Sequence, residues 1–305
     1  MNNENFKVGY IGIVGAPNVG KSSLINAIVR EKVAIVSPKP QTTRDAIMGI
    51  YNGENCQLIF IDTPGIHKTK DNLGQTMNKY SYAAAEDADV LIVIVDGSKK
   101  IGDEQIKFIK RFEKHKNVIL VVSKTDLTNF EKLYPSLAKL NEIDFLKDII
   151  PISSHKNRNI DVLIQSILKL LPNSSPEDAP YEIDMYTDKS VRFIAGEMVR
   201  EKVLLNLQDE IPHGVAVVVY QFEEDEAVAN ISADIICDKD SHKSIIIGSK
   251  GQMLKKIGID ARKDIEKMLG KHVVLNLFVK VRNNWKNNLA ILQEIGYNNN
   301  DIEIY

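Results

Sequence analysis

The chain has 305 residues, of which 44% are hydrophobic and 26% are charged, and its formal net charge is −2. This length predicts two domains, and the composition is typical of globular proteins rather than disulfide-rich or disordered ones. No apolar run approaches the roughly 20 residues that a bilayer span requires, which argues against a transmembrane protein and predicts a cytoplasmic one. The two cysteines, Cys56 and Cys237, lie far apart in probable strands and are expected to be buried thiols.

Apolar runs alternate with helical patterns over residues 7–171. The runs YIGIVG, QLIFID, VLIVIVD, NVILVVS and IIPIS are rich in Val, Ile and Leu, as in strands that are covered on both faces. Helices are expected between them, for example over 21–30, 105–115 and 160–171. A further strand near 46–51, followed by the turn signal NGEN, predicts an antiparallel hairpin. The pattern therefore predicts an α/β domain over 1–172, with a mixed six-stranded sheet and helices on both faces.

The first strand leads into GAPNVGKSS, which matches the phosphate-loop pattern G-x-x-x-x-G-K-[ST]. An amphipathic helix follows, so backbone N–H groups and a helix N-terminus can surround a phosphate. In this arrangement Lys21 contacts the β- and γ-phosphates, and the Ser22 hydroxyl binds Mg²⁺. The predicted phosphate site comprises Gly15, Ala16, Pro17, Asn18, Val19, Gly20, Lys21, Ser22 and Ser23.

Three shorter motifs follow later strands of the same domain. In DTPG, Asp62 is placed to hold the metal ion through water, and the Gly65 amide is placed to contact the γ-phosphate. In SKTD, the Asp126 carboxylate can accept hydrogen bonds from N1 and the exocyclic amine of guanine, which favours GTP over ATP. In ISS, a backbone amide near Ser154 can contact the guanine O6. The predicted base site comprises Ser123, Lys124, Asp126, Ser153 and Ser154.

The segment LPNSSPEDAPYEIDMYTD contains three prolines, several serines and acids, and no periodicity. It predicts a linker over 173–190 and movement of the two domains relative to each other.

The second half has the pattern of a smaller α+β domain over 191–287, followed by a C-terminal tail over 288–305. A helix near 192–207 precedes the strands GVAVVVYQF and ANISADIIC, and a second helix and the strand VVLNLFVKV follow the loop GSKG. This order of helix, strand, strand, helix and strand fits a KH domain, here of type II. In that fold a G-x-x-G loop clamps the backbone of about four nucleotides.

Charge supports a nucleic-acid partner for this loop, because residues 239–286 contain twelve Lys or Arg and four Asp or Glu, a local charge of +8. The alternative for such a run is a solvated helix face. We expect Ile245, Ile246 and Ile247 to form part of an apolar platform beneath the bases. The predicted RNA-binding residues are Ile247, Gly248, Ser249, Lys250, Gly251, Lys255, Lys256 and Arg262.

With GAPNVGKSS, QTTRD, DTPG, SKTD, ISS and the KH pattern in this order, the chain resembles the translation-factor-related GTPases and, among them, the Era family. The resemblance covers nearly the whole chain. It implies that Thr43 binds Mg²⁺ and reports the γ-phosphate, so that Lys21, Thr43 and Gly65 form the catalytic set. It also implies a role for Asn18 in holding a potassium ion, with an ordinary loop residue as the alternative.

Two positions depart from the patterns of related enzymes. SKTD begins with Ser123 where the motif commonly has asparagine, which predicts a weaker affinity for the base. Directly after DTPG the chain has Ile66 and His67, where Ras-like enzymes place a glutamine that orients water. Isoleucine cannot orient water, so the intrinsic hydrolysis rate is expected to be low, with acceleration by a cation, a switch rearrangement or a partner.

By this resemblance the protein is expected to be a bacterial, monomeric GTPase that binds GTP, GDP and Mg²⁺. Its implied partners are the 3′ region of small-subunit (16S) ribosomal RNA and the small ribosomal subunit during assembly. The alternative is an RNA-binding adaptor with a nearly inert guanine-nucleotide site. Ser123 and Ile66 are the two residues that support this alternative. A membrane-associated GTPase is disfavoured, although weak peripheral attachment to the inner face of the cell membrane stays open.

Overall fold

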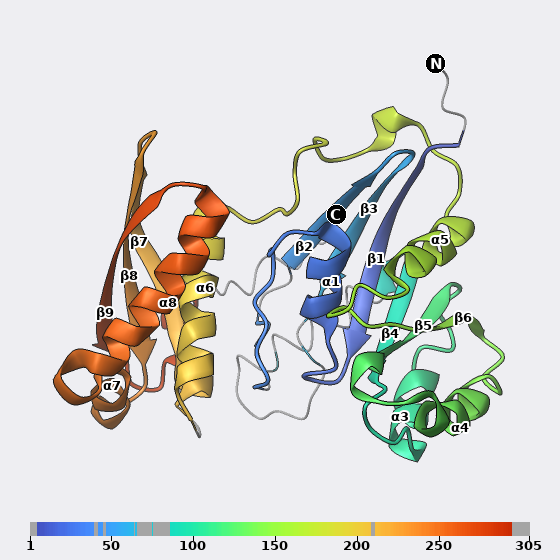
Figure 1. The fold of residues 1–305 in the computed structure, drawn as a ribbon, viewed down its shortest axis with the longest axis horizontal. Helices are drawn as coiled ribbons and strands as arrows, with labels where there is room; N and C mark the ends of the chain where they lie inside the picture. Colours follow the sequence, from blue (N-terminus) through green and yellow to red (C-terminus); the bar gives the residue numbers. More distant parts are fainter. Residues whose placement is uncertain are drawn as a thin grey trace. The chain divides into compact units, whose positions relative to one another are not determined.

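The computed structural model describes residues 5–39, 42–44, 47–63, 65, 75, 86–208 and 211–294. They belong to two compact units, both drawn in Figure 1. The first unit ends at Asp188. The second contains the chain from Lys189 onward and, in addition, the segment Ile35–Thr42 from the first half of the sequence.

A six-stranded sheet forms the centre of the first unit, with the strand order β2-β3-β1-β4-β5-β6. β2 and β3 pair antiparallel, and the other neighbours are parallel, so the predicted mixed sheet with a hairpin at one edge is confirmed. The strands are β1 (Lys7–Gly15), β2 (Ile47–Gly53), β3 (Cys56–Asp62), β4 (Val90–Asp96), β5 (Val118–Ser123) and β6 (Leu146–Pro151).

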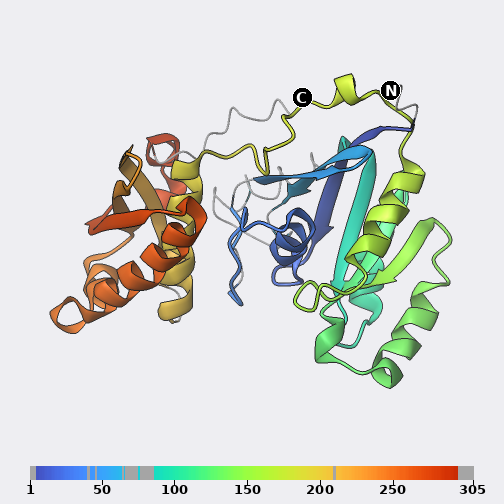
Figure 2. The ribbon, with the colours of Figure 1, turned by 45° about the horizontal axis from the view of Figure 1, so that its top comes forward.

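Helices cover both faces of this sheet, as Figures 1 and 2 show. On one face, Leu24 of α1 and Leu163 of α5 belong to the same buried cluster. On the other face, Ile109 of α3 and Leu133 of α4 share a second cluster. Burial on both faces explains why the central strands β4 and β5 are almost uniformly apolar. The helices are α1 (Lys21–Val29), α3 (Asp103–Lys110), α4 (Phe130–Leu140) and α5 (Ile160–Leu170).

The predicted linker lies along the edge of the sheet in the first unit. The Gln57 side chain donates to the Tyr181 carbonyl at 2.8 Å and accepts from the Tyr181 amide at 3.0 Å. Further on, the Ile50 amide donates to the Tyr186 carbonyl at 2.9 Å, and the Met48 amide donates to the Asp188 carboxylate at 3.0 Å. Residues up to Asp188 are thus attached to β2 and β3, which the irregular sequence did not predict.

The second unit has a three-stranded sheet in the order β7-β8-β9, with β7–β8 antiparallel and β8–β9 parallel. Helices pack on this sheet around a core that includes Met198, Ile235, Ile257 and Val279. The predicted α+β fold of KH type is confirmed. The elements are α6 (Val191–Asn206), β7 (Ala216–Glu224), β8 (Val228–Cys237), α7 (Asp240–Ile247), α8 (Gln252–Leu269), β9 (His272–Val281) and α9 (Leu289–Glu294).

Two helices of this unit were missed by the sequence prediction: α7, and the short helix α9, which lies in the predicted C-terminal tail. Residues Asp240–Ile247 form α7 directly before the G-x-x-G loop, so the order up to β9 is helix, strand, strand, helix, helix, strand. Three consecutive isoleucines favour extended structure locally. Burial of Ile246 in the core of the unit outweighs that preference. In the part of the chain that the structure describes, no helix is long and apolar enough to cross a membrane.

Candidate functional site

The phosphate loop joins the end of β1 to the start of α1, as its sequence pattern predicts. Asn18 and Gly20 have positive φ values of 62° and 105°, which turn the loop so that α1 begins at Lys21. The Lys21 ammonium group donates to the carbonyls of Gly15 at 3.2 Å and Ala16 at 3.1 Å. Two carbonyls of the loop therefore hold a buried cation beside a helix N-terminus, which favours anions.

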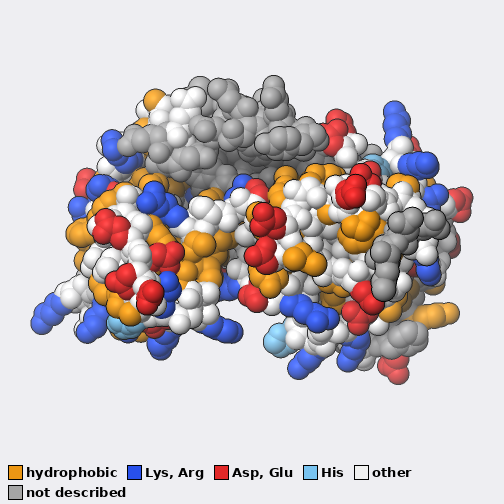
Figure 3. All heavy atoms as spheres, turned by 90° about the horizontal axis from the view of Figure 1, so that it is seen from above, with side chains coloured by type: hydrophobic (Ala, Val, Ile, Leu, Met, Phe, Trp, Pro, Cys, Tyr) orange, Lys and Arg blue, Asp and Glu red, His pale blue; other side chains and the backbone are white. Residues whose placement is uncertain are grey.

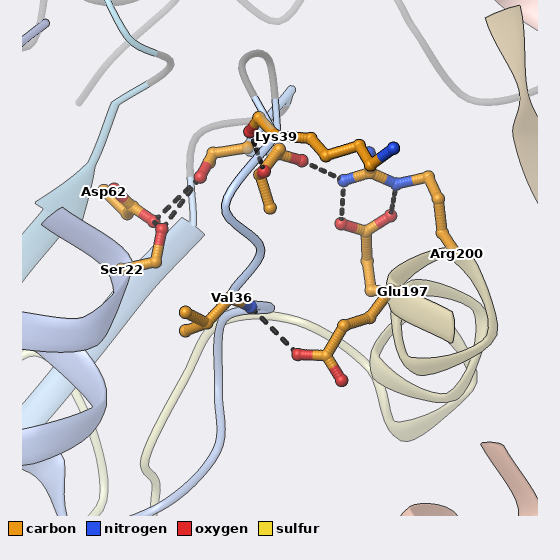
Figure 4. A network of polar contacts seen from close by, with 9 residues as sticks. Ser22, Val36, Lys39, Asp62, Glu197 and Arg200 are labelled. Carbon is orange, nitrogen blue, oxygen red and sulfur yellow. Dashed lines mark hydrogen bonds and ion pairs between the residues drawn. The ribbon is translucent and has the colours of Figure 1, made fainter. Parts of the chain in front are cut away.

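The predicted magnesium ligands lie together at the edge of this loop. The Ser22 hydroxyl donates to the Asp62 carboxylate at 2.6 Å, and Thr43 Oγ1 lies 2.9 Å from Ser22 Oγ and 3.3 Å from the same carboxylate oxygen. Figure 4 shows Ser22 and Asp62 pointing toward each other. Three elements thus converge: α1, β3 and the segment before β2.

These residues fit a magnesium ion. Asp62 is fully buried, and its second oxygen, Oδ1, has no hydrogen-bond partner among the described residues. A buried carboxylate oxygen without a partner is costly, and a cation or a water on that cation would satisfy it. Two hydroxyls, one carboxylate and the phosphates of a nucleotide are the oxygen ligands that Mg²⁺ prefers.

The Asp62 carboxyl should make metal binding depend on pH. Burial raises its pKa to about 6, although Lys21, Ser22 and Thr43 oppose the shift. Because the raised pKa favours the protonated form below pH 6 and Mg²⁺ needs the carboxylate, protons compete with the metal. We expect the Mg²⁺ affinity of the GDP complex to fall about tenfold per pH unit below pH 6.

Calorimetric Mg²⁺ titrations between pH 5 and 7.5 measure this slope. The phosphate of the nucleotide also titrates near a pKa of about 6. The Asp62→Asn variant is therefore the control, because only the nucleotide phosphate still titrates in its complex. Equal slopes in the two proteins would contradict the expectation.

Gly65 lies against the phosphate loop. A Cβ at this position would come within 2.8 Å of Pro17 backbone atoms, so only glycine permits this close approach. Thr63, which the sequence analysis did not single out, donates from its hydroxyl to the Ile13 carbonyl at 2.6 Å and ties the DTPG motif to β1. Ile66, His67 and Pro64 lie outside the described residues.

The Ser123 side chain contacts two backbone carbonyls. It is buried, and its hydroxyl lies 2.5 Å from the Val19 carbonyl and 3.0 Å from the Val95 carbonyl. The serine therefore connects the end of β5 to the phosphate loop. The neighbouring Lys124 donates to the Asn18 carbonyl at 2.5 Å and to Asp96 at 2.8 Å, and so acts on the same loop.

Replacing Ser123 with alanine should loosen the phosphate loop. The substitution removes the hydroxyl from two buried carbonyls, and such a loss typically costs about 1–3 kcal/mol. We expect the affinity for GDP to fall about tenfold, as measured by fluorescence titration with a labelled nucleotide. Ser241→Ala, at an exposed position of the second unit, is the control. An unchanged affinity in Ser123→Ala would show that the loop does not need this connection.

The predicted base-binding residues are brought together by the ends of β5 and β6. The Ser153 hydroxyl donates to the Asp126 carboxylate at 2.6 Å and, as the largest cause, holds the pKa of Asp126 below its usual value. Ser153 is completely buried, whereas Asp126 and Ser154 are partly exposed. An ionised carboxylate at this position can accept two hydrogen bonds from guanine.

The G-x-x-G loop lies in the second unit between α7 and α8. Gly248 and Gly251 have φ values of 72° and 76°, and Lys250 is also left-handed at 49°. Ser249 and Lys250 are exposed, and Gly251 caps the N-terminus of the 18-residue helix α8. The loop thus presents backbone N–H groups and a cation together, which suits a phosphate group.

A groove of about 490 Å³ extends from Gly251 between α8 and β9. Leu254, Ile259 and Leu277 are among its apolar lining residues, while Lys255 and Arg262 add positive charge. Lys256 is exposed but does not line the groove. The sequence analysis did not include the groove-lining residues of β9 among the predicted RNA-binding residues. The alternation of side chains along this strand was the signal that could have indicated them.

The predicted isoleucine platform is partly wrong. Ile246 is completely buried in the core, whereas Ile245 is 50% exposed and Ile247 is half-buried. The helical conformation of α7 causes this difference, because consecutive side chains on a helix point about 100° apart. Only Ile245 and Ile247 reach the surface beside the loop.

The face of the molecule drawn in Figure 3 carries both signs of charge. Lys and Arg side chains are interspersed there with Asp and Glu, in keeping with a net charge of −2.

Comparisons with known proteins identify both domains. A family model described as 50S ribosome-binding GTPase matches residues 10–124, and a KH-domain model matches residues 210–286. GTPase Era of Ruminiclostridium cellulolyticum is 43% identical over 298 residues, covering 97% of this chain and 99% of that protein. GTPase Era of Clostridioides difficile is 45% identical over 298 residues, covering 96% and 99%.

Two solved structures are similar over the same length. One is a variant of Aquifex aeolicus Era bound to GDP·AlF4⁻, and the other is Era in complex with MgGDPNP and nucleotides 1506–1542 of 16S ribosomal RNA. Each has a TM-score of 0.89 and 38% identity, and each comparison covers 96% of this chain and 99% of the other.

The fold and the two sites define a P-loop GTPase that carries a KH domain. The near full-length similarity specifies the family as well. The chain belongs to the Era GTPases, and the expectation of a GTP-hydrolysing enzyme is confirmed.

Proposed function

We propose that this GTPase binds the 3′ region of 16S ribosomal RNA through its KH domain and acts as a nucleotide-controlled switch in assembly of the small ribosomal subunit. The basic groove that starts at Gly251 carries the proposal, because it combines a phosphate-binding loop with an apolar floor of suitable size for bases. The similar Era structure that contains 16S ribosomal RNA supports the choice of RNA.

The proposal gives each site residue a role. Lys21 and the loop from Gly15 to Ser23 hold the phosphates, and Asp126 with Ser154 selects guanine. Ser22 and Thr43 bind Mg²⁺ directly, and Asp62 binds it through water. The Mg²⁺ ion, when bound, neutralises charge on the phosphates. Gly65 donates its amide to the γ-phosphate, which is why its close contact with Pro17 matters.

The RNA contacts and the remaining partners belong to the same proposal. Lys250 and the backbone of Gly248, Ser249 and Gly251 contact phosphate. Lys255, Lys256 and Arg262 add attraction, and Ile247 contributes apolar surface. Asn18 helps to hold a potassium ion at the phosphates. The protein acts as a cytoplasmic monomer on the small ribosomal subunit. Weak attachment of a fraction of the protein to the membrane surface is a further prediction.

Steady-state GTP hydrolysis tests this function. The rate is measured in sodium and in potassium, with and without a fragment of the 3′ end of 16S ribosomal RNA. We expect slow basal turnover that RNA and potassium each raise. If RNA binds but the rate stays flat in every condition, the two domains are not coupled and the protein acts as an RNA-binding adaptor.

A further inference from the structure

A carboxylate lies beside the phosphate loop, where it repels the phosphates of a nucleotide. Asp96 is the last residue of β4, its side chain is 9% exposed, and it lines the same hollow as Ala16 and Pro17 of the loop. The Lys124 ammonium group contacts this carboxylate at 2.8 Å and donates to the Asn18 carbonyl at 2.5 Å. Like charges repel most strongly where water is excluded. A negative side chain at this place therefore calls for an explanation.

The sheet of the first unit fixes the position of Asp96 relative to Lys124. Asp96 is directly opposite Ser123 in the parallel pairing of β4 with β5, and the Gly97 amide donates to the Ser123 carbonyl at 2.9 Å. One carboxylate oxygen, Oδ1, accepts from the Ser98 amide at 3.0 Å and from the Ser98 hydroxyl at 2.5 Å. This oxygen closes the turn after β4, and the other oxygen, Oδ2, orients the ammonium group of Lys124.

The two residues that the ammonium group connects have backbone conformations that few residues with a side chain adopt. Lys124 has a φ of 57° and Asn18 a φ of 62°, both in the left-handed region. Such conformations persist where surrounding contacts hold them. The ammonium group supplies one of these contacts at the Asn18 carbonyl. Because a lysine side chain has many rotamers, a fixed carboxylate beside it reduces the entropy that the contact costs.

We infer that Asp96 is a positioning residue for nucleotide binding. It holds the Lys124 ammonium group on the Asn18 carbonyl, and so keeps the phosphate loop in the shape that receives the phosphates. Asp96 acts through Lys124 and not by touching the nucleotide. This role depends on the proposed function, in which the loop holds the phosphates. Because GTP and GDP share those phosphates, both nucleotides are affected.

Fluorescence titration of the full chain with labelled GDP tests this role in the Asp96→Asn variant. Asparagine has the same shape, and its carbonyl oxygen can still accept from Ser98, but it cannot form an ion pair with Lys124. We expect the affinity for GDP to fall about tenfold. Removal of the charge alone has the opposite effect, because one negative group fewer near the phosphates tightens binding. The direction of the change therefore separates positioning from simple electrostatics.

Hydrolysis kinetics separate positioning from a loss of folded protein. When chemistry is slow, KM approximates the dissociation constant of GTP. Asp96→Asn should raise KM about tenfold and leave kcat within about threefold. Partial unfolding would instead lower the apparent kcat and leave KM unchanged. Asp144→Asn, at an exposed position before β6, is the matched control and should change neither quantity.

A double-mutant cycle shows whether Asp96 acts through Lys124. Lys124→Met removes the ammonium group, so adding Asp96→Asn to it should not weaken GDP binding further. Unchanged or tighter binding by Asp96→Asn alone, or a further loss in the double variant, would overturn the inference. Wild-type affinity for GDP in Lys21→Ala would instead overturn the proposed phosphate site, and the inference with it.

Discussion

Replacing Lys21 with alanine should lower kcat/KM for GTP hydrolysis by about 10³. Removing a single preorganised donor to a developing charge costs about 10² to 10³ in rate, and Lys21 is both donor and cation. Its side chain is 6% exposed and is oriented by the carbonyls of Gly15 and Ala16. Burial lowers its pKa to about 8 against the opposing effect of Asp62, so it is still protonated at pH 7.

A phosphate-release assay at saturating Mg²⁺ measures the loss. Lys169→Ala, an exposed lysine at the end of α5, controls for the removal of one positive charge and should retain full activity. A decrease of less than fivefold in Lys21→Ala would mean that the phosphates bind elsewhere.

The phosphate site was predictable because its signals are local. The loop from Gly15 to Ser23 lies between a buried strand and an amphipathic helix, and both follow from short-range periodicity. Asp62 and Asp126 likewise follow directly from apolar runs that form strands. Thr43 had no such local signal, and only the resemblance to a family pointed to it.

The connections between distant parts of the chain could not be predicted in the same way. Ser123 bonds to a carbonyl 104 residues earlier, and Arg200 to one 158 residues earlier. Such contacts depend on how the elements pack, whereas periodicity reports only the face on which a residue lies. The sequence placed Ser123 in the base site by its motif, and it gave no sign that the hydroxyl bonds to the phosphate loop.

Helix α7 shows a second limitation, because here the local sequence favoured a strand where the structure has a helix. Ile245, Ile246 and Ile247 are β-branched and favour extended structure. In the fold, however, Ile246 belongs to the buried core of the second unit, where α7 packs on α8, β8 and β9. Tertiary packing outweighed the propensity of a short segment, because each fully buried isoleucine contributes about 1.5–3 kcal/mol.

The two glycines of the KH loop differ in what their substitution would test. A Cβ on Gly248 would lie 2.7 Å from the Met253 Cβ, so any substitution there would distort the start of α8. Nothing lies within 4 Å of a Cβ on Gly251, whose φ of 76° is in the region that Asn and Asp tolerate best. Only Gly251 therefore offers a change that alters charge without altering the fold.

Gly251→Asp should weaken RNA binding by about tenfold to a hundredfold, whereas Gly251→Asn should weaken it less than about threefold. The two side chains have the same shape, and both cap a helix N-terminus well. Only the aspartate places a negative charge where the phosphates approach α8, which cancels the attraction from Lys250 and from the helix dipole. The number of phosphate contacts should fall by one or two, which lowers the salt dependence of the affinity.

Fluorescence anisotropy with a labelled 3′-terminal fragment of 16S ribosomal RNA, at several salt concentrations, measures both quantities. Thermal unfolding of the two variants should coincide within a few degrees, since their folds are expected to match. Weakening by asparagine as strong as that by aspartate would mean that the loop acts through its shape and flexibility. No weakening by aspartate would mean that RNA binds away from Gly251, because a buried or nearby phosphate cannot be indifferent to a new negative charge at this distance.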